Sequence, residues 1–369
     1  MQVNVFKIAQ TSPDDLTGLD QLIQTQRLDP ATIVAILGKT EGNGCVNDFT
    51  RGFAIQTLKA YLRSQIGVDL TEQIVYVMSG GTEGVLSPHL TVFTRQPSLP
   101  GAIAQLGLVL GISHTREFQP HEIGTLAMVD AVAAGVEAAI AQAQLTPQEV
   151  HFVQIKCPLL ASSRLQGYDA QLLKTTDTYK SMGYSRGAAA LGVAVALGEI
   201  SRQALTEADI CTNYSLYSSV ASASAGIELS NCEILVLGNA AHSTSQYVIG
   251  HSVMQHALDL AAVQHAIQSA TNGINSGDTA QSDNALTRVN PTIVNIFAKA
   301  EADPSGTLLH RRHTMLDDSD INHTRMARAV VGAVVAAVVQ DPMVYVSGGS
   351  EHQGPAGGGP VAAIARRHR

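Results

Sequence analysis

Three lysines stand at the ends of apolar, β-branched runs in this sequence of 369 residues. Each run predicts a buried strand that carries a lysine at its end. Burial and neighbouring positive charges lower the pKa of a lysine, and a neutral lysine can take the proton of a hydroxyl nucleophile. The runs are 34–39, 152–156 and 293–299, which end in Lys39, Lys156 and Lys299.

A serine follows each lysine further along the chain, at the start of a string of the form Ser-Gly/Ala-Gly-x-Glu. Small residues after the serine allow a tight turn, and their backbone NH groups can hold a developing oxyanion. A serine activated by a lysine is a nucleophile for acyl transfer. The strings are Ser79-Gly80-Gly81-Thr82-Glu83, Ser224-Ala225-Gly226-Ile227-Glu228 and Ser347-Gly348-Gly349-Ser350-Glu351.

An arginine lies between each lysine and its serine, after a hydroxyl residue and before a stretch rich in small apolar residues. A Ser or Thr in that place is an N-cap signal, so each arginine is predicted in the first turn of a helix. Three arginines near three lysines would depress the lysine pKa and could bind carbonyl groups or an anionic ring nitrogen. The pairs are Thr50-Arg51, Ser185-Arg186 and Thr324-Arg325.

The order Lys, Arg, Ser therefore occurs three times, which is the mark of an internal repeat. One such short string alone would be explained by chance, but three ordered sets would not. Strand and helix signals alternate within each third, so we predict an α/β fold of three repeated units over 1–100, 106–242 and 247–369, with linkers near 96–105 and 239–245. Three like groups around one pocket suit a small ring that looks alike in three directions, such as a cyclic imide.

Composition excludes several other classes of protein. The net charge is −8 and no basic cluster occurs before the last four residues, which argues against a nucleic-acid partner. No apolar run is long enough to span a membrane, and the sequence starts without a signal-peptide pattern. The cysteines form no C-x-x-C pair, so we expect neither a zinc site nor disulfides, and a cytoplasmic location. They are Cys45, Cys157, Cys211 and Cys232.

Glycine-rich strings at 80–84 and 354–360 suggest phosphate loops as an alternative. Neither has the lysine spacing of a Walker loop or the setting of a dinucleotide-binding fingerprint. The histidines also lack metal-ligand spacing, so no histidine metal site is predicted.

Several long strings resemble the cyanuric acid hydrolases, a family with barbiturases as close relatives, and the resemblance runs over essentially the whole chain. It implies three domains around a pseudo-three-fold axis, with a β-barrel core and helices outside. It also implies hydrolysis of cyanuric acid to carboxybiuret, which loses CO2 to give biuret, in a homotetramer. The strings are 38–48, 78–85, 153–158, 181–187, 222–228 and 345–349.

The same resemblance implies residue roles, with Lys156 as the base and Ser224 as the nucleophile. No catalytic cofactor is implied, but a structural Mg²⁺ or Ca²⁺ is, since one carboxylate and several carbonyl oxygens suit a hard cation. The substrate-binding set is Arg51, Ser79, Gly80, Arg186, Ser224, Ala225, Arg325, Ser347, Gly348, Lys39 and Lys299. The metal set is Glu301, Ser350, Gln353, Gly354, Pro355 and Gly358.

The residues themselves leave alternatives open. Only the second repeat has Ala225-Gly226 in place of Gly-Gly, which shows where the repeats differ but not which serine reacts. Barbituric acid is a second candidate substrate, and Ile321 and Asn322 beside Arg325 would tune that choice. A binder of cyclic imides without catalysis is a third possibility, although all three Lys, Arg and Ser sets are intact.

Overall fold

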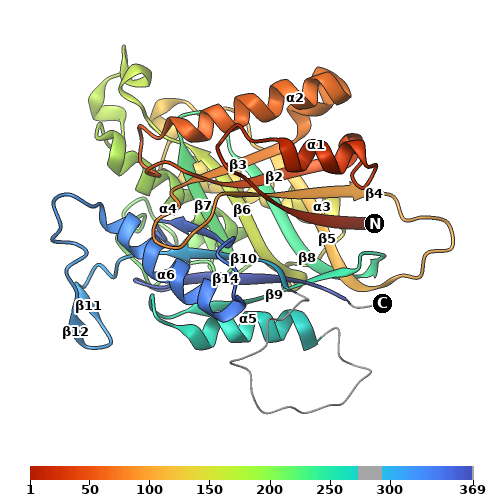
Figure 1. Ribbon diagram of the computed structural model, residues 1–369. Coiled ribbons are helices and arrows are strands. Elements are labelled where there is room, and N and C mark those ends of the chain that lie inside the picture. Colours follow the sequence, from red (N-terminus) through yellow and green to blue (C-terminus); the bar gives the residue numbers. More distant parts are fainter. Residues whose placement is uncertain (273–292, 368–369) are drawn as a thin grey trace.

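The computed structural model describes residues 1–272 and 293–367. We call 1–100, 106–242 and 247–369 the first, second and third unit. In each unit a strand, a helix, a second strand, a second helix and two more strands follow one another (Figure 1), and the third unit adds a short hairpin. The first unit comprises β1 (Gln2–Ala9), α1 (Thr17–Gln24), β2 (Ile33–Thr40), α2 (Phe49–Gln73), β3 (Val75–Gly80) and β4 (His89–Gln96).

The other two units repeat this order of elements. The second comprises β5 (Gln105–His114), α3 (Leu126–Ala143), β6 (Val150–Pro158), α4 (Thr178–Ala196), β7 (Ala221–Gly226) and β8 (Glu233–Ser243). The third comprises β9 (Tyr247–Met254), α5 (Leu260–Asn272), β10 (Ile293–Ala300), the hairpin β11 (Thr307–Leu308) and β12 (Arg311–Arg312), α6 (His323–Val339), β13 (Tyr345–Gly348) and β14 (Gly359–Arg366).

The three units form three four-stranded sheets with the same topology. Their strand orders are β1-β4-β2-β3, β5-β8-β6-β7 and β9-β14-β10-β13, so each unit places its own strands in the order first, fourth, second, third. In each sheet the second and third strands pair in parallel, and the fourth runs antiparallel to the second. The fold is mixed α/β as predicted. Within the described residues the sheets are separate and open, so the closed barrel is not confirmed.

A shared core fills the space between the three sheets. Successive side chains of a strand point to opposite faces of its sheet, so every second residue faces this centre. Phe152 and Tyr345 both pack on Phe297 there, with ring centroids 5.4 and 5.7 Å apart. The core includes Val3, Val5, Leu37, Val77, Phe93, Leu110, Phe152, Leu237, Ile249, Phe297, Tyr345 and Ile364.

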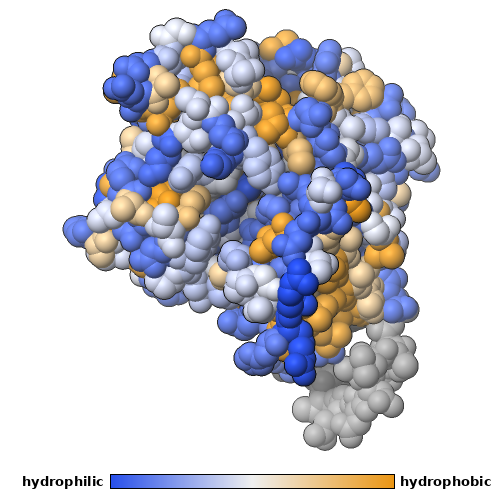
Figure 2. Space-filling model, turned by 90° about the vertical axis from the view of Figure 1, so that its left-hand side faces the viewer, coloured by the Kyte–Doolittle hydropathy of each residue, from blue (hydrophilic) through white to orange (hydrophobic). Residues whose placement is uncertain are grey.

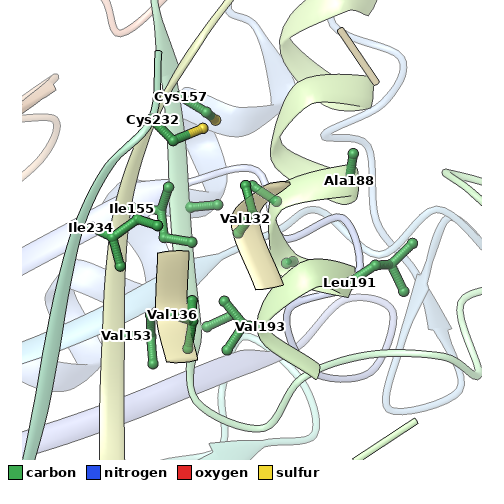
Figure 3. Close-up of a cluster of buried hydrophobic side chains, with 14 of the residues drawn as sticks. Val132, Val136, Val153, Ile155, Cys157, Ala188, Leu191, Val193, Cys232 and Ile234 are labelled. Carbon is green, nitrogen blue, oxygen red and sulfur yellow. The ribbon is translucent and has the colours of Figure 1, made fainter. Parts of the chain in front are cut away.

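The outer face of each sheet is covered by the helices of its own unit. Figure 3 shows this for the second unit, where Val136 of α3 lies beside Val153 of the sheet and Val193 of α4 points toward Val136. Helix α3 is long and apolar enough to cross a membrane by length and composition, but half of it is buried in the protein. Its apolar surface is thus explained by packing against β5, β8 and α4.

Some predicted boundaries were wrong. Residues 239–243, predicted as part of a linker, continue β8, because the strand pairs with β5 as far as Ser243. Helix α4 begins at Thr178 and its N-cap is Asp177, so Arg186 lies well inside the helix and not in its first turn. The polar composition of residues 271–284 predicts an exposed connection, and this segment lies almost wholly outside the described residues.

Candidate active site

Each of the three lysines lies directly opposite its serine on a neighbouring parallel strand. Lys39 pairs in register with Ser79, Lys156 with Ser224, and Lys299 with Ser347. On each strand the lysine is an even number of residues from a residue of the central core, as Lys299 is from Phe297, so the two side chains lie on the same face of the sheet. Strand periodicity therefore turns all three lysines inward, where each side chain is fully buried.

In the first and third units the lysine contacts its own serine. Lys39 Nζ lies 3.4 Å from Ser79 Oγ and 3.4 Å from the carbonyl oxygen of Gly80. Lys299 Nζ lies 3.2 Å from Ser347 Oγ and 3.3 Å from the carbonyl oxygen of Gly348. These two dyads share one geometry.

In the second unit the lysine has other partners. Lys156 Nζ donates to the carbonyl oxygen of Met78 at 2.9 Å and forms an ion pair with Glu228 Oε1 at 3.0 Å. The Ser224 hydroxyl is buried and has no hydrogen-bond partner among the described residues. The second dyad therefore differs from the others despite the same backbone register.

Three arginines complete the set, but the third is not the one that the sequence suggested. Arg51 and Arg186 are buried in α2 and α4. In α6 the buried arginine is Arg328, whose side chain is 3% exposed, whereas that of Arg325 is 38% exposed. In the sequence, Arg328-Ala329-Val330 is similar to Arg186-Gly187-Ala188, which is the signal for Arg328. The pair Thr324-Arg325 instead matches Thr50-Arg51, which favoured Arg325.

Two of these arginines are held by glutamates of the Ser-containing strings. Arg186 binds Glu351 with two hydrogen bonds, of 2.8 Å from Nε and 2.6 Å from Nη2. Arg328 Nε donates to Glu83 Oε2 at 2.9 Å. Each pair joins a glutamate of one unit to an arginine of another, and sequence analysis had assigned these glutamates no role.

The serines and arginines of all three units line one narrow pocket. Lys156 lines it, while Lys39 and Lys299 are not among its lining residues. The lining comprises Gly44, Arg51, Met78, Ser79, Gly80, Lys156, Met182, Arg186, Ser224, Ala225, Arg328, Ser347 and Gly348. The lysine-bearing strand ends lie toward the left of Figure 1, and the face on that side is hollowed near its middle (Figure 2).

A larger cavity of about 340 Å³ adjoins this pocket, and Arg186 lines both. Its walls come from the second and third units and include Tyr179, Tyr184 and Tyr214. Asn322 Nδ2 donates to the Tyr179 hydroxyl at 3.0 Å, linking the start of α6 to the start of α4. Asn322 thus contacts a wall residue of this cavity but is not among the lining residues of either the cavity or the narrow pocket.

Comparison with known proteins decides the family. The model of the family described as "Amidohydrolase ring-opening protein" matches residues 4–366. The chain belongs to this ring-opening amidohydrolase family.

Individual members of the family match along their full length. The cyanuric acid amidohydrolase of Pseudomonas sp. (strain ADP) is 50% identical over 374 residues, which cover 99% of each chain. A cyclic amide hydrolase of Azorhizobium caulinodans is 46% identical over 99% of this chain and 100% of its own. The crystal structure of a cyanuric acid hydrolase from A. caulinodans matches with a TM-score of 0.90 at 46% identity, covering 100% of this chain and 99% of the other.

Burial and charge set the acidity of the lysines in this family member. Burial lowers the pKa of Lys39 well below its usual value, and the charge of Arg328 adds to the effect. Burial and Arg186 lower the pKa of Lys299 to about 7. Burial also lowers the pKa of Lys156, but there the negative charge of Glu228 acts in the opposite direction.

The residue after each serine shows how crowded each dyad is. A Cβ on Gly80 would lie 1.7 Å from Asp48 Oδ2, and a Cβ on Gly348 would lie 2.6 Å from Arg328 Nη1. The second unit has Ala225 at this place, so its dyad has room for a methyl group. The three serines therefore differ in their surroundings as well as in their lysine contacts.

The six residues of the predicted metal set lie close together beside β10 and β13. The backbone NH of Ser350 donates to Glu301 Oε2 at 2.7 Å, and the Ser350 hydroxyl donates to the carbonyl oxygen of Gly358 at 3.1 Å. Burial and the charge of Glu351 raise the pKa of Glu301 above its usual value. Within the described residues no three His, Cys, Asp or Glu side chains form a metal cluster, so Glu301 would need backbone oxygens as further ligands.

Proposed function

We propose that this protein hydrolyses cyanuric acid, opening the ring to carboxybiuret, which loses CO2 to give biuret. The observation that carries this proposal is the pocket lined by three serines and three arginines, one of each from every unit. Cyanuric acid presents three equivalent carbonyl groups, which such a pocket can hold alike. Membership of the ring-opening family and the names of the relatives point the same way.

The proposed chemistry uses Ser224 as the nucleophile and Lys156 as the base. Neutral Lys156 takes the hydroxyl proton while Ser224 Oγ forms a bond to a ring carbonyl carbon. Backbone NH groups of the small-residue turn and nearby arginines stabilise the resulting oxyanion. When the C–N bond breaks, the ring nitrogen receives a proton from the Lys156 ammonium group. Water then hydrolyses the acyl-enzyme, with Lys156 again acting as base.

Two observations support the second dyad as the reacting pair. Lys156 is the lysine that lines the pocket, and the Ser224 hydroxyl is not engaged by a neighbour within the described residues. The first and third dyads have closer Lys–Ser contacts at rest, which favours them as fixed hydrogen-bonding groups. In this scheme Ser79 and Ser347 hold the other two carbonyls.

The remaining pocket residues bind the ring. Arg51, Arg186 and Arg328 face a substrate that is acidic and readily anionic, and Arg328 takes the role that sequence analysis gave to Arg325. Gly80 and Gly348 let the ring approach the backbone closely. Lys39 and Lys299 contact Ser79 and Ser347 and orient their hydroxyls from outside the pocket, since neither lysine is among the pocket-lining residues.

A hard cation such as Mg²⁺ fits the cluster around Glu301. One buried carboxylate and the carbonyl oxygens of a tight loop are the donors that such ions prefer. The bound ion would supply positive charge beside Glu301 and Glu351 and would hold the Ser350–Gly358 loop in place. The residues for it are Glu301, Ser350, Gln353, Gly354, Pro355 and Gly358.

We also infer a homotetramer in the cytoplasm. The tetramer follows from the family resemblance, and the location from the cysteine pattern. The four cysteines are all free thiols in the structure, which suits a reducing compartment.

Product analysis tests the proposed activity. Purified protein incubated with cyanuric acid is expected to release biuret and CO2, and barbituric acid is expected to react more slowly. Barbituric acid, which is also a cyclic amide, is the alternative substrate, and one relative is named only as a cyclic amide hydrolase. Equal or faster turnover of barbituric acid would replace the first substrate by the second, and tight binding of either ring without turnover would indicate a non-catalytic protein.

A further inference from the structure

The glutamate that ends each Ser-Gly/Ala-Gly-x-Glu string has a different partner in the second unit. Glu83 and Glu351 bind the buried arginines of other units, Arg328 and Arg186. Glu228 forms an ion pair with Lys156 of its own unit instead. The Arg–Glu arrangement is thus formed twice and is absent at the third place where the repeat would put it.

Arg51 is the pocket arginine that takes part in neither of these two Arg–Glu pairs. Its Nη2 donates to the carbonyl oxygen of Cys45 at 2.9 Å, while its buried Nε has no hydrogen-bond partner among the described residues. Arg51 is close enough to Glu228 for its charge, together with that of Lys156, to lower the pKa of this carboxyl against the effect of burial. A buried guanidinium with an open donor and a nearby carboxylate are complementary partners.

We propose that Glu228 is a positioning residue that exchanges partners, binding Lys156 in the free enzyme and Arg51 when the ring is bound. In the free enzyme the Glu228 carboxylate keeps Lys156 turned away from Ser224. Transfer of Glu228 to Arg51 completes the third Arg–Glu pair and frees Lys156 to approach the Ser224 hydroxyl. The exchange explains why the reacting dyad is the one without a resting Lys–Ser contact. It rests on the proposed function of this site.

The exchange also controls the charge of the base. Lys156 is surrounded by Glu228, Arg51, Cys157 and Glu233, and of these Glu228 is the nearest opposite charge. A carboxylate at this distance favours the ammonium form, so its departure lowers the lysine pKa and delivers a neutral base. A substrate that triggers the exchange therefore activates its own nucleophile.

A crystal structure of Ser224→Ala with cyanuric acid bound tests the exchange without relying on turnover. We expect Glu228 within ion-pair distance of Arg51, and Lys156 released from it. A bound ring with the Lys156–Glu228 pair still at about 3.0 Å would overturn the exchange while leaving the proposed substrate intact. Failure to bind the ring while wild-type protein also releases no biuret would count against the proposed function itself.

The pH dependence of kcat/KM provides a second test, with Glu228→Gln and the matched variant Glu83→Gln. Because Lys156 must be neutral, kcat/KM rises with pH through the lysine pKa. Glu228→Gln removes the charge that raises this pKa. We therefore expect the acidic limb of the kcat/KM profile of this variant to move to lower pH by about one unit or more. Glu83→Gln should raise KM and leave the limb in place, because Glu83 binds Arg328.

An unmoved limb in Glu228→Gln, or equal movement in both variants, would overturn the proposal. If Glu228→Gln does not fold, Glu228→Asp replaces it. The shorter carboxylate keeps the charge but cannot reach both partners, so kcat should fall at least tenfold with little change in KM. Wild-type kcat in Glu228→Asp would also contradict the exchange.

Discussion

The second and third dyads have the same backbone and different side-chain contacts. Lys156 and Ser224 lie opposite each other on parallel strands, as do Lys299 and Ser347. Yet Lys299 contacts its serine at 3.2 Å, whereas Lys156 contacts Glu228 at 3.0 Å. The repeated fold thus determines where the groups stand, and the neighbouring side chains determine what each group can do.

This difference explains how three similar dyads can serve one reaction. In the proposed mechanism one carbonyl of the ring is attacked and two are held. The two dyads with a Lys–Ser contact would hold carbonyls, and the dyad whose serine hydroxyl has no partner among the described residues would react. The first dyad behaves like the third, since Lys39 also contacts its serine. Substitutions at matched positions of different units therefore test whether the dyads differ in function.

The largest difference is expected between lysines of the second and first units. Lys156→Met removes the proposed base and should lower kcat by about a thousandfold or more, as for other residues that activate a nucleophile. Lys39→Met removes only a group behind Ser79 and should act mainly on KM. Steady-state kinetics with cyanuric acid would measure both, and comparable losses of kcat would remove the distinction between the dyads.

A smaller difference is expected between Arg328 and Arg325, which both lie near Glu83. Arg328→Ala leaves Glu83 buried without its principal partner, so the free energy of unfolding should fall by about 3–5 kcal/mol. Arg325→Ala loses a half-exposed contact and should cost about 1 kcal/mol or less. Urea unfolding of both variants, with kcat/KM measured alongside, checks this. A larger loss of kcat/KM in Arg325→Ala than in Arg328→Ala would return the substrate-binding role to Arg325, as the sequence suggested.

The smallest difference concerns the residue after the serine. Gly80→Ala would displace Asp48, which caps α2 by accepting from Thr50, and the free energy of unfolding should fall by about 1–2 kcal/mol. Ala225→Gly removes one methyl group where there is room for it and should cost about 1 kcal/mol or less. Thermal unfolding of the pair checks this, and an unchanged stability in Gly80→Ala would show that Asp48 does not cap the helix as described.

Much of this site could be predicted from the sequence because it rests on local patterns. The apolar runs before the three lysines specify buried strands, and strand periodicity then places each lysine on the inner face. The serine strings likewise end the neighbouring strands. These features depend on residues close together in the chain, so the repeats are visible without a structure.

Other features depend on contacts between units, which no local pattern reveals. Arg328 was missed because its partner Glu83 lies in another unit, and Thr324-Arg325 looked more like Thr50-Arg51. The partner of Glu228 could not be predicted either, since all three strings end in the same glutamate. The closed barrel, the unit boundaries, the metal and the tetramer stay predictions.

The kcat values of Ser224→Ala, Ser79→Ala and Ser347→Ala on cyanuric acid test the central claim most directly. We predict that Ser224→Ala loses biuret formation by about a thousandfold or more, because no nucleophile remains. Ser79→Ala and Ser347→Ala should keep measurable turnover with a raised KM, each losing about 10- to 100-fold in kcat/KM for one hydrogen bond to the ring. Retained turnover in Ser224→Ala, with complete loss in one of the other two, would contradict the account.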